Sequence, residues 1–356
     1  MMETKSSASK SANASTTTAP TLDGRALFYM FLLSIQFAFQ PMLTRAYTPQ
    51  SICRSTVILA QEIIKFMLAA SMLHMSGNYT KAVEGWNVST WVTVAFLPAA
   101  LYAIQNIFAL QAYQNLDALT FNVLNQTKTL SAALCCYLVM GRKQSFVQVI
   151  SLLLLLLSAL IMERIISLDV IMESTGFGSG SPSEDEEPHH AIELPELTSQ
   201  HWVQGVLPIM LASFISGLSG ALSQKNLQAQ GGGRNPYLFS MELCAASTLI
   251  LVSSLLWSPD GKRISEDGFW NGWTATTFIP IFTNAVGGII VGLVTKYAGS
   301  VSKGFALIFG MFLSGVFQAL VTDEGVSVEQ GVGGLLAAVS LYLHATHPHV
   351  PKTKQD

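Results

Sequence analysis

Residues 144–162 read QSFVQVISLLLLLLSALIM and contain no Asp, Glu, Lys or Arg. A bilayer core about 30 Å thick takes roughly 20 apolar residues of helix to cross, so this stretch is long enough for a transmembrane helix. The same absence of charge recurs in six further stretches, at 26–44, 88–116, 202–224, 268–295, 304–322 and 330–351. This repetition predicts a polytopic membrane protein.

Three more apolar stretches are interrupted by isolated ionisable residues. Glu62 and Lys65 lie within 55–77, Lys128 lies within 117–141, and Glu242 lies within 235–259. The 356 residues are 50% hydrophobic and 12% charged, with a mean hydropathy of +0.42, whereas an average soluble domain is about 25% charged. With these three stretches, the sequence predicts an all-α fold of ten transmembrane helices.

The distribution of Lys and Arg predicts the orientation, because cytosolic loops of membrane proteins carry an excess of both residues. With ten spans and a cytosolic N-terminus, the cytosolic side holds twelve of them: Lys5, Lys10, Arg25, Lys81, Arg142, Lys143, Lys225, Arg234, Lys296, Lys303, Lys352 and Lys354. The lumenal side holds five: Arg45, Arg54, Arg164, Lys262 and Arg263. We therefore expect both termini in the cytosol, with unglycosylated sequons at Asn78 and Asn87.

The chain divides into two halves around an acidic insert. Residues 1–24 are expected to form a disordered Ser/Thr/Ala-rich cytosolic tail rather than a cleaved signal peptide, and 347–356 a second cytosolic tail. The insert, 167–200, is expected to be disordered in the lumen, and it separates five spans in 25–166 from five in 201–346. Because five is odd, the halves would be inverted repeats, an arrangement common in alternating-access transporters. This symmetry rests on the span count alone.

Lys128 lies near the middle of its predicted span, where a charge costs about 3 kcal/mol on insertion scales. Polar residues recur around it at helical spacing and form one stripe, made of Asn122, Asn125, Gln126 and Thr129, beside a second stripe made of Phe121, Asn125 and Lys128. A stripe this polar is not expected to face lipid. Two interpretations follow: Lys128 binds a substrate in a pathway through the protein, or it pairs with a carboxylate such as Glu62.

Other polar residues within predicted spans are also candidates. Glu62 and Lys65 are three residues apart on one helical face, which suits either an internal ion pair or contact with a ligand. Gln105, Asn106 and Tyr113 could contact a base or sugar, although hydrogen bonds between helices explain the two amides nearly as well.

Lys296 and Lys303 flank the turn between the eighth and ninth predicted spans. Lys303 lies at a helix N-terminus, where unpaired backbone N–H groups and the helix dipole favour an anion. Lys128 and Lys303 come from different halves, so their convergence would suit a phosphate or diphosphate. Alternatively, both Lys296 and Lys303 are cytosolic anchors, an interpretation that suits Lys296 better.

Enzyme, metal and disulfide functions find no support in the sequence. Walker A, nucleophile-elbow, HExxH and CxxC motifs are absent. His189, His190 and His201 lack the spacing of a metal site, so neither a metal nor another cofactor is expected. The four cysteines, Cys53, Cys135, Cys136 and Cys244, lie mostly in apolar spans and are expected to be free packing residues.

Several of these motifs resemble the nucleotide-sugar transporters of the drug/metabolite transporter superfamily. Residues 102–106 (YAIQN), 114–118 (QNLDA) and 125–135 (NQTKTLSAALC) resemble the first signature region, closest to the branch of CMP-sialic acid, UDP-galactose and UDP-N-acetylglucosamine carriers. Residues 287–297 and 302–305 (SKGF) resemble the second. The resemblance covers about residues 25–345, without the insert.

The resemblance implies antiport, in which a nucleotide-sugar enters the lumen in exchange for a nucleoside monophosphate. By position, Lys128 and Lys303 match lysines that contact the nucleotide, Asn106 matches a binding-site asparagine, and Phe121 replaces the usual tyrosine; Ser302 lies in the second signature. The stretch 240–247 (SMELCAAS) does not match the Tyr and Ser expected near the base in the CMP-sialic acid branch. The chain is more similar to a plant-like branch for UDP-N-acetylhexosamines, and this resemblance implies UDP-N-acetylglucosamine or UDP-N-acetylgalactosamine, exchanged for UMP.

The C-terminus reads PKTKQD, which places Lys352 and Lys354 in a K-x-K-x-x retrieval signal for the endoplasmic reticulum. Expected partners are therefore the lipid bilayer and coat proteins that read this signal, with no nucleic acid; a homodimer is compatible with the sequence. Two alternatives stay open. One is an exchanger of phosphorylated sugars or other organic anions in the same superfamily, and the other is a non-transporting membrane scaffold or cargo receptor.

Overall fold

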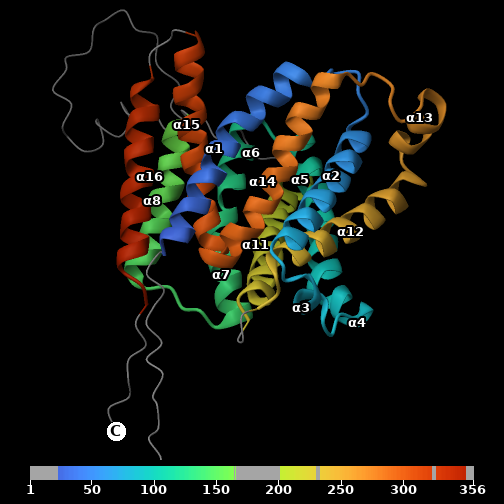
Figure 1. Cartoon of the computed structure of the whole chain (residues 1–356). Coiled ribbons are helices and arrows are strands. Elements are labelled where there is room, and N and C mark those ends of the chain that lie inside the picture. Colours follow the sequence, from blue (N-terminus) through green and yellow to red (C-terminus); the bar gives the residue numbers. More distant parts are fainter. Residues whose placement is uncertain (1–22, 164, 166–200, 230–232, 323–325, 350–356) are drawn as a thin grey trace, which may run out of the picture.

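The computed structural model describes residues 23–163, 165, 201–229, 233–322 and 326–349, and within these ranges the chain is helical without strands. The principal helices (Figure 1) are α1 (Gly24–Tyr47), α2 (Arg54–Met75), α5 (Leu97–Asn115), α6 (Ala118–Gln126), α7 (Lys128–Met140), α8 (Phe146–Met162), α11 (Leu207–Leu227), α12 (Pro236–Leu255), α14 (Phe278–Tyr297), α15 (Ser300–Thr322) and α16 (Val328–Thr346). Short elements are α3 (Tyr79–Val83), α4 (Val88–Trp91), η1 (Val92–Phe96), η2 (Trp202–Val206), α13 (Pro259–Asp267) and η3 (Ala275–Thr277).

Seven helices of the described chain are long and apolar enough to cross a membrane: Gly24–Tyr47, Arg54–Met75, Val88–Asn115, Trp202–Leu227, Pro236–Leu255, Ala275–Tyr297 and Ser300–Val321. They confirm a helical polytopic membrane protein. The other three predicted spans also contain helix, but α6 and α7 are divided at Thr127 and α8 has only 17 residues, whereas α16 has 19 residues and is not among the seven.

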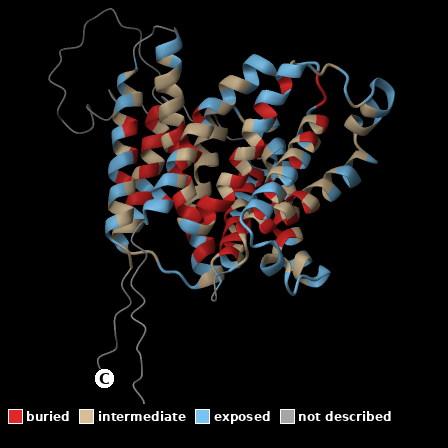
Figure 2. Cartoon of the chain, in the orientation of Figure 1, coloured by how far each residue is buried: buried red, intermediate tan, exposed pale blue. Residues whose placement is uncertain are grey.

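Buried residues concentrate inside the helix bundle and exposed ones on its outside (Figure 2). Many of the exposed residues are large and apolar. Phe28, Ile107, Leu138 and Phe146 are between 56% and 79% exposed. Soluble monomers rarely expose apolar surface on this scale, whereas lipid chains cover it without cost. The exposed apolar surface is therefore the face that the protein presents to the bilayer.

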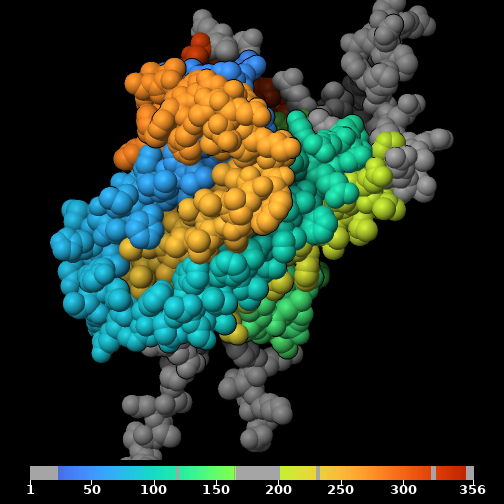
Figure 3. Space-filling view, turned by 90° about the vertical axis from the view of Figure 1, so that its right-hand side faces the viewer, coloured from blue at the N-terminus to red at the C-terminus, as the bar shows by residue number. Residues whose placement is uncertain are grey.

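Helices from the two halves of the sequence pack against each other throughout the molecule. Helix α11 lies against α5 and α7, α1 lies against α14 and α15, α2 lies against α12 and α14, and α8 lies against α16. On the face shown in Figure 3, α12 lies between α2 and α5. The interface between the halves therefore runs through the centre of the bundle.

Small residues allow the backbones at this interface to approach closely. A Cβ atom on Gly217 of α11 would lie 2.6 Å from the carbonyl carbon of Ser131 in α7, and one on Gly310 of α15 would lie 2.9 Å from the carbonyl oxygen of Ser34 in α1. Any larger residue would force the helices apart. Close packing explains these glycines.

Two short π segments, η1 and η2, each precede a Leu-Pro pair. Pro98 has no N–H, so the carbonyl of Val94 lacks the partner that an α-helix would give it. Asn226 of α11 donates to this carbonyl at 3.2 Å, and the Ser219 hydroxyl of the same helix donates to the Pro98 carbonyl at 3.0 Å. These bonds fix α11 against the third predicted span.

Candidate functional site

Lys128 is the first residue of α7 and follows directly on a break in the helix. Thr127 has φ −63° and ψ −11°, and its hydroxyl donates to the Leu124 carbonyl at 2.6 Å. The Thr127 backbone N–H also donates to the Leu124 carbonyl, three residues back, at 3.2 Å, so the α-helical hydrogen-bond pattern is interrupted at this residue. The break places half-buried Lys128 at a helix N-terminus inside the protein.

Lys303 lies in the first turn of α15, after a tight turn at Gly299, whose φ is +93°. Gln224 of α11 holds the beginning of this helix, because its side-chain oxygen accepts a hydrogen bond from the Ser300 backbone N–H at 2.8 Å. The Ser300 hydroxyl donates in turn to the Gly220 carbonyl at 2.7 Å. Lys303 is therefore positioned by α11, the helix that also packs on α7.

The two lysines converge at the contact between α7 and α15. Gly304 packs against Thr129, where a Cβ atom on the glycine would lie 2.6 Å from the threonine Oγ1. Lys128 is the neighbour of Thr129 and Lys303 is the neighbour of Gly304 in this contact, and neither lysine forms an ion pair with another described residue. Two like charges in a partly buried place favour an anion between them.

The polar stripe before Lys128 is half-buried. Asn122, Asn125 and Gln126 all lie in α6, and the Gln126 amide donates to the Glu163 carboxylate at 3.3 Å. Phe121 packs edge-on against Tyr113 of α5, with ring centroids 5.3 Å apart. Glu163 was not among the predicted site residues, because by sequence it only ends the charge-free stretch 144–162.

Glu62 pairs with Lys65 of the same helix and not with Lys128. Lys65 Nζ lies 2.6 Å from Glu62 Oε1, and both side chains are largely buried. A Cβ atom on Gly288 of α14 would lie 2.7 Å from the Lys65 side chain. The internal ion pair predicted from the spacing is present, whereas contact of this pair with a ligand stays a prediction.

The remaining candidate residues differ in how far they are buried and do not lie together. Gln105 is buried and its amide donates to Asn106 at 3.5 Å, whereas Asn106 and Tyr113 are exposed. Lys296 donates to the Arg234 carbonyl at 3.4 Å, at the end of α14. Ser302 is buried beside Lys303.

A buried charge cluster around Glu242 of α12 was missed as a structural feature. Trp86 donates to Glu242 Oε1 at 2.7 Å, Trp91 donates to its backbone carbonyl at 3.1 Å, and Arg234 forms a bidentate ion pair with its carboxylate. The sequence did contain a signal for this cluster, because Glu242 is the single charged residue in an otherwise apolar stretch. These contacts join the two halves between α4 and α12.

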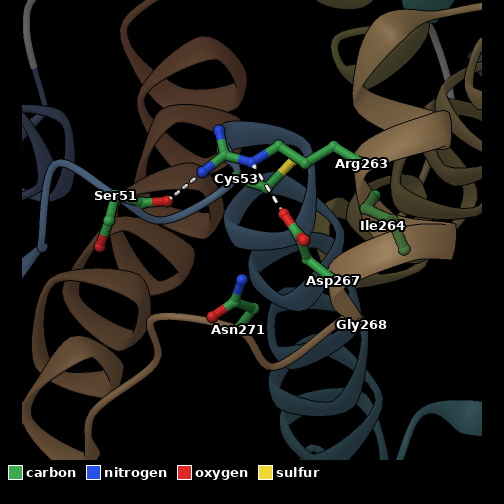
Figure 4. A pocket seen from close by; sticks show the side chains of 7 residues that line it. All are labelled: Ser51, Cys53, Arg263, Ile264, Asp267, Gly268 and Asn271. Atoms are coloured by element: carbon green, nitrogen blue, oxygen red, sulfur yellow. Dashed lines mark hydrogen bonds and ion pairs between the residues drawn. The ribbon is translucent and has the colours of Figure 1, made fainter.

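The described chain also has a small surface pocket beside α13, lined by Ser51, Cys53, Arg263, Ile264, Asp267, Gly268 and Asn271 (Figure 4). Arg263 already pairs with Asp267 at 3.7 Å and donates to the Ser51 carbonyl at 2.5 Å. This pocket is therefore closed by its own residues.

The described residues contain neither a candidate metal site nor a disulfide. They contain no group of three or more His, Cys, Asp or Glu side chains that could hold a metal ion; His201 is described, and His189 and His190 lie outside the described residues. Cys53, Cys135, Cys136 and Cys244 are all buried free thiols.

The fold defines a polytopic helical membrane protein, and comparison with known proteins defines its family. A sequence profile described as "Nucleotide-sugar transporter" matches residues 23–345. The UDP-N-acetylglucosamine transporter ROCK1 of Arabidopsis thaliana is 32% identical over 331 residues, 93% of this chain and 95% of its own length. The UDP-galactose translocator of Mus musculus is 29% identical over 250 residues, 69% and 57% of the two chains.

A solved crystal structure shares the fold with a TM-score of 0.60 at 11% identity, covering 90% of this chain and 96% of the other. The chain belongs to the nucleotide-sugar transporter family. The family and these relatives are transporters and not enzymes.

Proposed function

We propose that this protein carries a UDP-sugar, with UDP-N-acetylglucosamine or UDP-N-acetylgalactosamine favoured, into the lumen in exchange for UMP. The observation that carries the proposal is the convergence of Lys128 and Lys303 at the Gly304–Thr129 contact, in a chain of this family. Two lysines that flank one helix contact, without acidic partners among the described residues, match the charge of a diphosphate or monophosphate. The names of the relatives support a UDP-sugar.

Alternating access is the proposed mechanism. Ten crossings in two inverted five-helix halves would place one lysine in each half. An empty carrier would hold two unpaired like charges during the crossing, whereas a bound nucleotide would neutralise them. Exchange of one nucleotide for another then follows from electrostatics, because the loaded states cross at the lower cost.

The proposed location is the endoplasmic reticulum, with cycling through the Golgi and with both termini in the cytosol. Lys352 and Lys354, which coat proteins would recognise, lie outside the described residues, as do 1–22 and the acidic segment 166–200. The count of Lys and Arg on the two sides supports this orientation. A homodimer stays a prediction.

Counterflow in proteoliposomes tests the exchange directly. Vesicles preloaded with UMP, CMP or GMP are offered labelled nucleotide-sugars, and we expect uptake of a UDP-N-acetylhexosamine only with UMP inside. Uptake driven by CMP or GMP would contradict the choice of base. Transport of a phosphorylated sugar that free UMP does not inhibit would favour the organic-anion exchanger instead, and the absence of any exchange would favour a scaffold.

A further inference from the structure

A carboxylate reaches the polar stripe of α6 from the end of another helix. Helix α8 has only 17 residues, about 26 Å at the usual rise of 1.5 Å per residue, so it is shorter than a bilayer core of about 30 Å. Glu163 follows α8 directly and accepts a hydrogen bond from Gln126 at 3.3 Å. The Asn122 side chain approaches the same carboxylate. Glu163 therefore lies beside the stripe that leads to Lys128.

Two hydrogen-bond acceptors in this cluster are buried without a donor from the described residues: Glu163 Oε2 and Asn125 Oδ1. A buried polar atom without a partner costs free energy, and more so when it carries charge. Asn125 lies on α6 itself, and Glu163 contacts Gln126 of the same helix. The cluster therefore lacks hydrogen-bond donors, which a bound ligand would supply.

The chemistry of the two acceptors selects one part of a nucleotide-sugar. A carboxylate repels phosphate groups, which the two lysines attract. The uracil ring presents one N–H between two carbonyl oxygens that a carboxylate would also repel. The ribose presents two hydroxyls, whereas an N-acetylhexosamine presents more hydroxyls and also an amide N–H, so it offers the larger set of donors to a carboxylate and an amide oxygen. Exchange of UMP, which contains the ribose alone, separates the two.

We propose that Glu163 and Asn125 form the sugar-binding subsite of this carrier, with Glu163 accepting hydrogen bonds from the sugar hydroxyls or the acetamido N–H. This inference rests on the proposed function and deepens it, because it separates recognition of the sugar from recognition of the phosphate. Gln126 positions the carboxylate through its hydrogen bond. UMP, which has no sugar beyond its ribose, does not use this subsite.

The test compares two transport assays on Glu163→Gln in proteoliposomes. One assay follows labelled UDP-N-acetylglucosamine entering vesicles that contain UMP, and the other follows UMP exchanging for UMP. We expect the KM for the UDP-sugar to rise about tenfold, the effect of losing roughly 1.4 kcal/mol of binding, with UMP exchange unchanged. Glu163→Asp, which keeps the charge, should lie closer to the wild-type protein. Glu84→Gln, at an exposed carboxylate after α3, is the matched control and should behave as wild type in both assays.

The outcomes separate this inference from the proposed function. Failure of the wild-type protein to exchange UMP refutes the proposed function before any variant is made. An unchanged KM for the UDP-sugar in Glu163→Gln overturns the sugar-binding subsite. Equal loss of UMP exchange and UDP-sugar uptake, in Glu163→Gln and Glu163→Asp alike, also overturns it, because the carboxylate would then support the fold or the nucleoside.

Discussion

Gly304 of α15 lies so close to Thr129 of α7 that a Cβ atom on the glycine would be 2.6 Å from both the Oγ1 and the Cγ2 of the threonine. Each residue is the immediate neighbour of a candidate lysine. The contact joins a helix of the first half to a helix of the second, so it determines how closely Lys128 and Lys303 approach. Their spacing thus depends on the absence of a side chain at position 304.

A larger residue at this position should weaken transport. Gly304→Val would push α15 away from α7, and overpacking of this kind costs about 1–3 kcal/mol. We expect UMP exchange to fall by about tenfold or more, with a smaller loss for Gly304→Ala. Gly331→Val is the control, because Gly331 also lies in a helix but has open space around its Cα. Equal activity of both valine variants would show that the contact does not position the lysines.

The Glu62–Lys65 pair can be assigned to structure or to binding by a pair of variants. Lys65→Met leaves the Glu62 carboxylate buried and unpaired, and breaking a buried ion pair costs about 3–5 kcal/mol. We expect a lower thermal unfolding temperature in detergent for this variant, with recovery when Glu62→Gln is added. A Lys65→Met protein that unfolds like the wild type but no longer transports would instead assign the pair to ligand contact.

The C-terminal lysines should determine where the protein resides in the cell. Replacing Lys352 and Lys354 with serine removes the K-x-K-x-x signal and should shift the protein from the endoplasmic reticulum to the Golgi. The measurement is fluorescence microscopy with a tag at the N-terminus, which leaves the signal free. Thr353→Ala is the control. An unchanged distribution of the double variant would refute retrieval through these residues.

Sequence alone predicted the helical membrane fold and selected both lysines: Lys128 because a charge stands out in an apolar stretch, and Lys303 because it lies at the predicted start of a span. Three features could not be found this way. One is the interruption of the helix at Thr127, where the backbone N–H and the hydroxyl both donate to the Leu124 carbonyl. Another is the contact of Glu242 with Trp86 and Trp91, which are far from it in the chain.

The third feature is the position of Glu163, which by sequence lies after the fifth predicted span and in the structure contacts Gln126 of α6. Its role depends on the short length of α8 and on how α8 lies relative to α6. Contacts between residues far apart in the chain require the tertiary arrangement. The local sequence pattern therefore identified Lys128 and Lys303 as candidates but did not identify Glu163.

The central claim is that two lysines from opposite halves jointly bind the phosphate groups. The most direct measurement is UMP-for-UMP exchange in proteoliposomes by Lys128→Ala and by Lys303→Ala, with Lys81→Ala as an exposed control. We predict that each lysine variant elutes as folded protein and loses exchange, while the control retains it. Wild-type exchange in both Lys128→Ala and Lys303→Ala would contradict the account.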